Sequence, residues 1–299
     1  MSNWSDQEIA AAREALEETE LPSRPQGLLE AFKAQSAFAP DLAVAADAIG
    51  RDMALSAAVL RAANHNLSGY QGKIASVREA VMLLGFGGLR ELVAEQFLDA
   101  PLAVMGSPAH EIRLRAQICA RVCELLAALL PQRAGAMLSG HLPSVAPDVA
   151  HTLGLLHDAG AMLMTRRFRD YAALCDEHVH SDGAELLAAE RSRYGFDHTL
   201  AGWLAWRDWG LPKALCRAVA AHHDGVRFLR PDQPASERTV AALQGILSLA
   251  LRLAGQTSDA QWREQGPALL VALHLTPSEW SVLNDQIARA GALDPAEVE

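Results

Sequence analysis

Apolar side chains recur at every third or fourth position along most of this 299-residue chain. That spacing places them on one face of a helix, whereas a half-buried strand needs apolar and polar residues to alternate. Alanine and leucine dominate, and β-branched and aromatic residues are sparse, which also favours helices. We therefore predict an all-α protein with enough apolar residues for one substantial core or two modest ones.

Short local signals predict where several helices begin. Ser5 with Glu8 and Ser76 with Glu79 have the spacing of a capping box, in which the serine oxygen accepts a hydrogen bond from the third backbone N–H of the helix. The same spacing recurs at residues 276–279, with a proline at the first helical position. The helices that we predict span residues 6–19, 26–36, 41–50, 53–64, 76–84, 88–98, 109–130, 147–165, 168–178, 182–194, 198–208, 212–222, 237–255, 266–274 and 277–290.

A proline-containing break from Ala100 to Pro108 separates two groups of predicted helices. The break is too short for a flexible linker, so we interpret it as a seam between two helical subdomains that pack together. The organisation that we predict is an N-terminal helical extension at residues 1–20, a helical subdomain at 21–105, a second helical subdomain at 106–255 and a C-terminal helical segment at 256–299.

The charge balance argues against nucleic acid as a partner. There are 36 acidic and 26 basic residues, a formal net charge of −10, and the basic residues form no cluster. The helices predicted at 41–50 and 53–64 could mimic a helix-turn-helix, but Arg61 is the only basic residue of the second one. A nucleic-acid binder is therefore the weakest of the functional hypotheses.

Nothing in the sequence indicates secretion or membrane insertion. No uncharged apolar segment approaches the length of about 18 residues that a membrane span needs, and the N-terminus is polar and acidic. The four cysteines (Cys119, Cys123, Cys175 and Cys216) form no CxxC pair, and the first two lie one helical turn apart in an apolar run. We expect reduced thiols in a cytoplasmic protein with no membrane partner.

A histidine and an aspartate stand side by side in an apolar helix at Gly154-Leu155-Leu156-His157-Asp158. Because a buried carboxylate is costly unless a partner, a proton or a metal ion offsets its charge, something must neutralise Asp158. Further along, His198 follows Gly195-Phe196-Asp197, and His222-His223-Asp224 ends a predicted helix. Imidazoles and carboxylates from several helices are how a helical bundle builds a metal site.

Each of these residues also has a purely structural explanation. A single histidine on a helix is more often a hydrogen-bonded core or surface residue than a ligand, and histidines at a helix C-terminus can complement the helix dipole. Trp203, Trp206 and Trp209 are three residues apart, which predicts a stripe in the core rather than a platform for stacking bases. The residues alone therefore leave metal binding as one hypothesis among others.

An ordered series of short patterns runs from residue 21 to residue 255. In the first half these patterns are Leu21-Pro22-Ser23-Arg24-Pro25, Ile49-Gly50-Arg51-Asp52-Met53, Leu60-Arg61-Ala62-Ala63-Asn64, Lys73-Ile74-Ala75-Ser76-Val77 and Leu83-Leu84-Gly85. In the second half they are Gly154-Leu155-Leu156-His157-Asp158, Phe196-Asp197-His198, Trp209-Gly210-Leu211-Pro212 and His222-His223. Together they resemble the HDOD family.

The resemblance implies two packed helical subdomains, the second a degenerate form of the HD-type metal-dependent phosphohydrolase fold that the HD-GYP cyclic-di-GMP phosphodiesterases share. HDOD proteins are usually regarded as non-catalytic modules of bacterial signalling. In the catalytic relatives, one metal is held by an early helical histidine, the His-Asp pair and a late aspartate. A second metal is held by the same aspartate and by histidines further downstream.

Carried over to this chain, the resemblance implies that the two sets of metal ligands are unequally preserved. Arg115 stands where the early histidine is expected, and Leu251 is the best match to the late aspartate. The GYP signature is missing after Asp224. The residues that could still form a remnant metal site are His157, Asp158, His198, His222 and His223.

An arginine is always charged and presents a fork to carboxylates, so Arg115 could replace the first metal and pair with Asp158 directly. Two-metal phosphoester hydrolysis needs both ions, so the loss of one set of ligands should remove most of the activity. The only cofactor that we expect is one divalent metal ion (Fe, Mn, Zn or Mg) at partial occupancy.

We therefore predict a non-catalytic regulatory protein of bacterial signal transduction, with no catalytic residue assigned. It would act through protein contacts or through a small ligand in the remnant cleft. Its partners would be signalling proteins, and it could form a homo-oligomer. The alternative is a metal-dependent phosphohydrolase that acts on a nucleotide or a cyclic dinucleotide.

Overall fold

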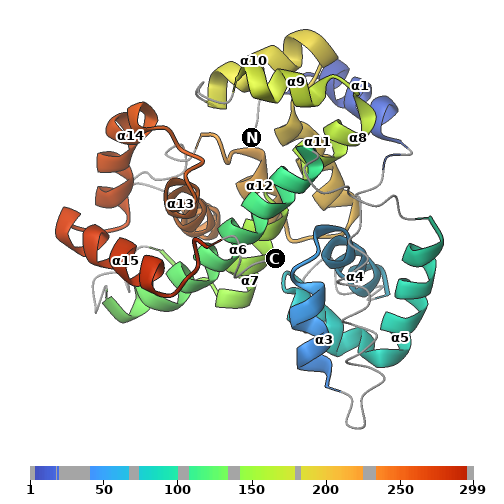
Figure 1. The fold of residues 1–299 in the computed structure, drawn as a ribbon, viewed down its shortest axis with the longest axis horizontal. Helices are drawn as coiled ribbons and strands as arrows, with labels where there is room; N and C mark the ends of the chain where they lie inside the picture. Colours follow the sequence, from blue (N-terminus) through green and yellow to red (C-terminus); the bar gives the residue numbers. More distant parts are fainter. Residues whose placement is uncertain are drawn as a thin grey trace.

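The described part of the chain is helical, which confirms the predicted all-α class. The computed structural model describes residues 4–17, 19, 41–66, 74–99, 108–133, 142–178, 183–224 and 234–294. Within these ranges every regular element is a helix (Figure 1). The helix predicted at 26–36 lies outside the described residues. Across the described ranges, no helix combines the length and the apolar character that crossing a bilayer would require.

Three helices form the N-terminal subdomain, in which α5 packs against both α3 and α4 (Figure 1). They are α3 (Leu42–Ile49), α4 (Met53–Asn66) and α5 (Val77–Asp99). The helices predicted at 76–84 and 88–98 are joined in α5, where the backbone at Gly85 is non-helical with φ 60°. Glycine adopts this left-handed conformation because it has no Cβ to clash with the backbone.

The second subdomain is built around α6, α7 and α13, which contact one another in the core. Its elements are α6 (Pro108–Arg133), α7 (Pro147–Leu156), α8 (Ala159–Arg167), α9 (Tyr171–Glu177), α10 (Gly183–Tyr194), α11 (His198–Asp208), α12 (Lys213–Ala220), the short 3-10 helix η2 (Ala235–Glu237) and α13 (Arg238–Leu253). The predicted tryptophan stripe packs in its core: Trp206 is fully buried, Trp209 is nearly so, and Trp203 is partly buried against the same core.

Two further helices, α14 (Asp259–Ala272) and α15 (Pro277–Arg289), follow the second subdomain. The capping box predicted at residues 276–279 is present at the start of α15. The predicted start of the preceding helix at residue 266 was wrong. That helix begins seven residues earlier, where the Ser258 hydroxyl accepts a hydrogen bond from the N–H of Gln261 at 3.1 Å, and Pro267 lies inside it.

The two subdomains are in direct contact, as the short seam between them predicted. The N–H of Val77 donates to the hydroxyl of Thr152 at 3.3 Å, which ties the start of α5 to α7. The ring of His151, also on α7, makes a 3.1 Å hydrogen bond to the carbonyl oxygen of Gly50. A single cluster of buried apolar residues extends from α3 through α7 to α15.

The first helix, α1 (Asp6–Leu16), packs on α8 and α11 of the second subdomain. Its predicted capping box is present, with Ser5 and Glu8 bonded to each other's backbone N–H. The guanidinium of Arg167 donates to the carbonyl oxygen of Ala15 at 2.7 Å. The N-terminal extension therefore supports α11, which begins with His198, and α8, which begins directly after His157-Asp158.

Candidate metal site

The pair His157-Asp158 lies at a break between two helices. The prediction of one continuous helix at 147–165 was wrong, because α7 ends at Leu156 and α8 begins at Ala159. The apolar periodicity that suggested one helix continues across the break and so hides it. Asp158 occupies the N-cap position of α8, but its carboxylate makes no capping hydrogen bond. The carboxylate is therefore available to residues on other helices.

Helices α8 and α11 touch backbone to backbone beside this break. A Cβ on Gly160 would overlap the carbonyl oxygen of His198 and would lie 2.5 Å from the backbone N of Gly202. Only a glycine at 160 therefore lets α8 lie directly on the start of α11. The close approach places Oδ1 of Asp158 3.9 Å from Nε2 of His198.

His198 is the first residue of α11, and the residues before it fix the direction of its ring. The Asp197 carboxylate caps the helix by accepting from the N–H of Leu200 at 2.9 Å. Arg191 on α10 pairs with the same carboxylate at 2.5 Å. Because the start of α11 is held in this way, His198 points inward and is only 2% exposed.

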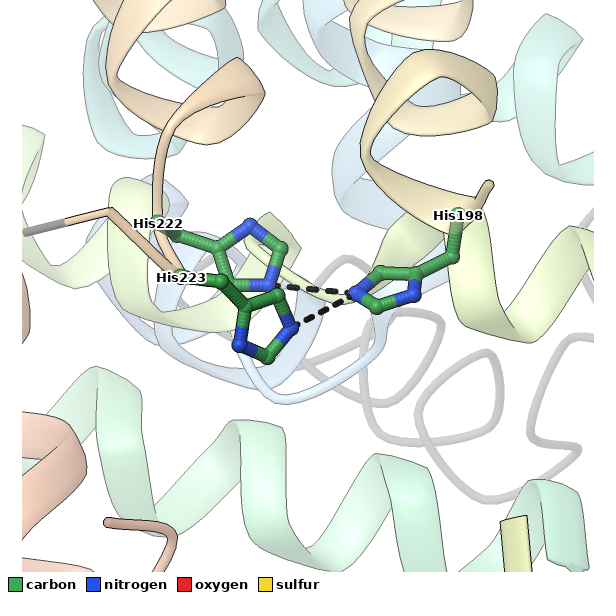
Figure 2. Close-up of side chains that lie close together, drawn as sticks. All are labelled: His198, His222 and His223. Atoms are coloured by element: carbon green, nitrogen blue, oxygen red, sulfur yellow. Dashed lines mark hydrogen bonds between the residues drawn. The ribbon is translucent and has the colours of Figure 1, made fainter. Parts of the chain in front are cut away.

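His222 and His223 follow α12, in the turn that ends this helix at Ala220. The Nδ1 of His222 donates to the carbonyl oxygen of Val219 at 2.7 Å, which holds the ring against the end of its own helix. His222 is buried and His223 is partly buried. The two adjacent histidines both face the start of α11 (Figure 2).

The structure brings all five residues of the predicted remnant site together. Figure 2 shows His198 on one side and His222 and His223 on the other, with their rings converging. Nε2 of His198 is 3.3 Å from Nε2 of His222 and 2.9 Å from Nε2 of His223. Asp158 Oδ1 lies 3.5 Å from Nε2 of His222, and Asp158 Oδ2 lies 3.4 Å from Nε2 of His157.

Hydrogen bonds on the far side of three rings assign the hydrogen to Nδ1 and leave Nε2 facing the cluster. Nδ1 of His157 donates to the carbonyl oxygen of Gly154 at 2.7 Å, and His222 makes the equivalent bond to its own helix. Nδ1 of His198 lies 2.8 Å from the carboxylate of Glu190. A partner on one ring nitrogen is what commonly orients the other nitrogen towards a metal ion.

Opposite charges stabilise the ionised forms of the His-Asp pair. Burial by itself raises the pKa of Asp158, but His157 lowers it well below its usual range. Burial lowers the pKa of His157, but the charge and hydrogen bonding of Asp158, together with Cys119, raise it well above its usual range. Nε2 of His157 is nevertheless buried without a hydrogen-bond partner among the described residues.

The pKa values of the remaining three histidines are shifted in different directions. Burial lowers the pKa of His198, but the carboxylates of Glu190, Asp158 and Asp197 together raise the pKa to about 9. Burial lowers the pKa of His222. Burial, together with the charges of the two neighbouring rings, holds the pKa of His223 well below its usual range. His222 and His223 are thus kept in the neutral form, which carries the lone pair that a metal ion needs.

These donors fit a divalent transition-metal ion. One nitrogen from each of His198, His222 and His223 lies within 4.8 Å of the other two. Two nitrogens bound tetrahedrally to one ion such as zinc stand about 3.3 Å apart, close to the separations found here. Three imidazoles with the carboxylate of Asp158 suit iron, manganese, cobalt or zinc better than magnesium, which prefers oxygen ligands. Nε2 of His157, which lies 3.4 Å from Asp158 Oδ2, borders the same cluster.

The predicted ion pair between Arg115 and Asp158 was wrong. The guanidinium of Arg115 is half exposed and lies 3.8 Å from the carboxylate of Glu111, one turn away on α6. In the described part of the chain, the ion pairs of Asp158 are with His157, His198 and His222. Consecutive helical residues point about 100° apart, so Arg115 faces outward although the next residue, Ala116, is fully buried.

A small cavity of about 60 Å³ opens beside the cluster. Leu251, at the position expected for the late aspartate, is buried and lines this cavity with an apolar side chain. The opposite wall comes from α14 and the residues before it. The wall residues from this segment are Gln256, Thr257, Gln261, Trp262, Gln265, Gly266 and Leu269.

Sequence reasoning missed three parts of the site. Glu190 is fully buried on α10 and touches His198, but in the sequence it is one of two glutamates in its helix and belongs to no motif. The hydroxyl of Tyr171 donates to Glu190 at 2.6 Å, and no sequence motif singled out this tyrosine. The wall formed by α14 was also missed, because the predicted helix began too late to include Gln261 and Trp262.

Comparisons with known proteins agree with the fold. The sequence model of the HDOD domain matches residues 21–225. Compared by sequence with proteins of curated function, the chain matches none. The structure is similar to that of the MmoQ response regulator from Methylococcus capsulatus, with a TM-score of 0.64 and 22% identity over 89% of this chain and 98% of that one. It is also similar to a virulence factor from Campylobacter jejuni, with a TM-score of 0.57 and 15% identity over 98% of this chain and 95% of the other.

Proposed function

Because the chain belongs to the HDOD family, we propose that it is a regulatory protein of bacterial signal transduction rather than a two-metal phosphohydrolase. Its second subdomain would hold one divalent transition-metal ion in the remnant cleft. The output would pass through contacts with signalling proteins or through a small ligand bound beside the ion.

One observation carries this proposal. One nitrogen each of His198, His222 and His223 lies within 4.8 Å of the others, and Asp158 Oδ1 lies 3.9 Å and 3.5 Å from the first two. The residues at the other expected ligand positions do not join them. Arg115 faces outward and pairs with Glu111, and Leu251 offers no donor atom. The donor set therefore supports one ion. Since two-metal hydrolysis uses one ion to generate hydroxide and another to stabilise the developing charge, we expect the loss of one set to remove most of that activity.

The residues that would hold the ion are Asp158, His198, His222 and His223. A bound divalent ion would supply Lewis acidity and a water ligand of lowered pKa. The backbone carbonyls of Gly154 and Val219 hold the rings of His157 and His222 in place. His157 would keep the carboxylate of Asp158 oriented towards the cluster, since their facing atoms are 3.4 Å apart.

The size of the cavity limits what can bind beside the ion. Pockets for drug-sized ligands occupy about 300 Å³ or more, whereas this cavity measures about 60 Å³. That volume holds a few water molecules or a small anion, and a cyclic dinucleotide would enter only if α14 moved. The wall residues Gln261 and Gln265 would present amide groups to such a small ligand.

The test combines metal content with turnover. We expect elemental analysis of the purified full chain to find no more than one transition-metal ion per molecule. We also expect no metal-dependent turnover of cyclic-di-GMP or of a panel of nucleotides at saturating manganese, iron or zinc. Asp158→Ala is the matched variant, and it should lose the ion.

The phosphohydrolase alternative is supported by one observation, the survival of Asp158 next to three histidines. It makes the opposite prediction in the same experiment. Two ions per chain, or metal-dependent turnover that is lost in Asp158→Ala, would overturn the regulatory proposal and establish the hydrolase.

A further inference from the structure

Glu190 is a fully buried carboxylate that lies behind His198, on the side away from His222 and His223. We propose that Glu190 is a positioning residue of this site: it holds the ring of His198 so that Nε2 faces His222 and His223, and its negative charge favours a doubly charged cation as the occupant. The inference deepens the proposed function and rests on it.

The contacts of Glu190 leave its carboxylate little freedom. Both of its oxygens lie 2.8 Å from Nδ1 of His198. Oε2 also accepts the backbone N–H of His198 at 3.0 Å, and Oε1 accepts the hydroxyl of Tyr171 at 2.6 Å. One side chain therefore holds both the backbone and the ring of His198. Rotation of the ring about χ2 would break the bond to Nδ1 and carry Nε2 away from the cluster.

One divalent cation could balance the charges of the two carboxylates beside the cluster. In the described ranges, the ion pairs of Glu190 and Asp158 are all with histidines, whereas Asp197 pairs with Arg191. Two buried or half-buried carboxylates therefore have no permanent positive partner. When an ion is bound, the histidines that ligate it are neutral, and the two charges of a divalent cation would then balance both carboxylates. Burying a carboxylate without such compensation is costly.

Tyr171 supports this arrangement from a third helix. Its hydroxyl on α9 bonds to the carboxylate on α10, which in turn bonds to the first residue of α11. Tyr171 is itself fully buried, so its hydrogen bond is shielded from water. The chain of contacts from Tyr171 through Glu190 to His198 resembles the carboxylate–histidine–metal arrangement, in which outer partners raise metal affinity.

A purely structural role for Glu190 predicts a different outcome. In that case the residue would only anchor the start of α11, and its loss would lower stability without changing how the folded protein binds metal. Glu190→Gln separates the two roles because it keeps the size of the side chain and removes its charge. A carboxamide also offers one acceptor oxygen in place of two, so it cannot accept from Tyr171 and from both N–H groups of His198.

The experiment measures zinc and manganese affinity of the full chain by competition with a chelator, after removal of any bound metal. We expect Glu190→Gln to weaken binding about 10- to 100-fold, and Tyr171→Phe to weaken it less. Glu177→Gln, an exposed glutamate on α9, is the control and should bind as the wild type does. Circular dichroism confirms that each variant is folded.

A second readout follows the ring nitrogens of His198 in the metal-free protein by ¹⁵N NMR. The hydrogen on Nδ1 should persist in the wild type and decrease in Glu190→Gln. If Glu190→Gln folds and binds both metals with unchanged affinity, the proposal is wrong. If Glu190→Gln does not fold, Tyr171→Phe decides, and an affinity equal to that of the wild type overturns the proposal.

The two readouts also separate this inference from the proposed function. If the wild type takes up no ion at all, the single-metal proposal fails. The NMR measurement then still decides the role of Glu190: a redistribution of the ring hydrogen in Glu190→Gln supports positioning, and an unchanged ring overturns it.

Discussion

Gly160 on α8 and Gly202 on α11 lie in backbone contact, so that a Cβ on Gly160 would stand 2.5 Å from the backbone N of Gly202. This contact determines how close Asp158, two residues before Gly160, comes to the histidine cluster. The geometry of the site thus depends on two residues that have no side chain to contribute.

Gly160→Ala should destabilise the protein and loosen the site. The added methyl group meets backbone on two sides and cannot be relieved by a change of rotamer, so we expect a loss of about 1–3 kcal/mol or more in the free energy of unfolding. Urea unfolding checks this. Gly87→Ala is the control, because a Cβ there meets nothing within 4 Å. An equal effect in both variants would contradict the packing argument.

Arg115→Met should leave metal affinity unchanged, because the guanidinium faces outward and pairs with Glu111. Its stability should change by less than about 1 kcal/mol, as for other exposed ion pairs. In the same competition assay, His222→Ala should lose most of the affinity. If Arg115→Met altered metal binding as strongly as His222→Ala, the charge of Arg115 would have to reach the cluster after all.

Trp262→Ala should open the cavity beside the cluster. Trp262 lines the cavity, lies 5.2 Å from Trp280 ring to ring, and is packed so tightly that a Cβ on Gly266 would lie 2.8 Å from it. Removing the indole should speed the release of bound metal to a chelator, measured by stopped flow. Val271→Ala is the control on the same helix, since Val271 is 74% exposed. Equal release rates for the three proteins would rule out α14 as a barrier.

The contact between the subdomains should weaken in acid. A hydrogen bond with His151, which also contacts Gly50, lowers the pKa of Glu124 from its ordinary value of 4.5. Stability from a lowered carboxyl pKa is fully present above the unfolded value and is lost as the pH falls through the folded value. Glu124→Gln should therefore cost less than about 1 kcal/mol at pH 7, since Glu124 is half exposed.

The check on the acid prediction is the difference in urea midpoint between Glu124→Gln and the wild type at pH 7 and at pH 4. The difference should be smaller at pH 4, where the wild-type carboxyl group begins to take up a proton. A difference that stays constant, or that grows in acid, would show that the carboxylate of Glu124 does not strengthen the junction.

Local patterns in the sequence were sufficient to predict the helical class and several helix boundaries. The capping boxes at Ser5 and Thr276 depend on residues three positions apart, so no distant part of the chain is needed to recognise them. The candidate ligands Asp158, His198, His222 and His223 could also be named from the sequence. They belong to short motifs that follow one another along the chain in the same order as in the HDOD family, and this order identifies them.

Only the tertiary structure decided how these residues are partnered. The rotation of α6 turns Arg115 away from the cluster, and a change of one residue in helical phase would have reversed that result. Glu190 on α10 reaches His198 at the start of α11, and Trp262 on α14 lines the cavity beside the cluster. Such contacts join residues that are distant in sequence, and their free energy depends on burial and orientation, which apolar periodicity and capping signals do not contain.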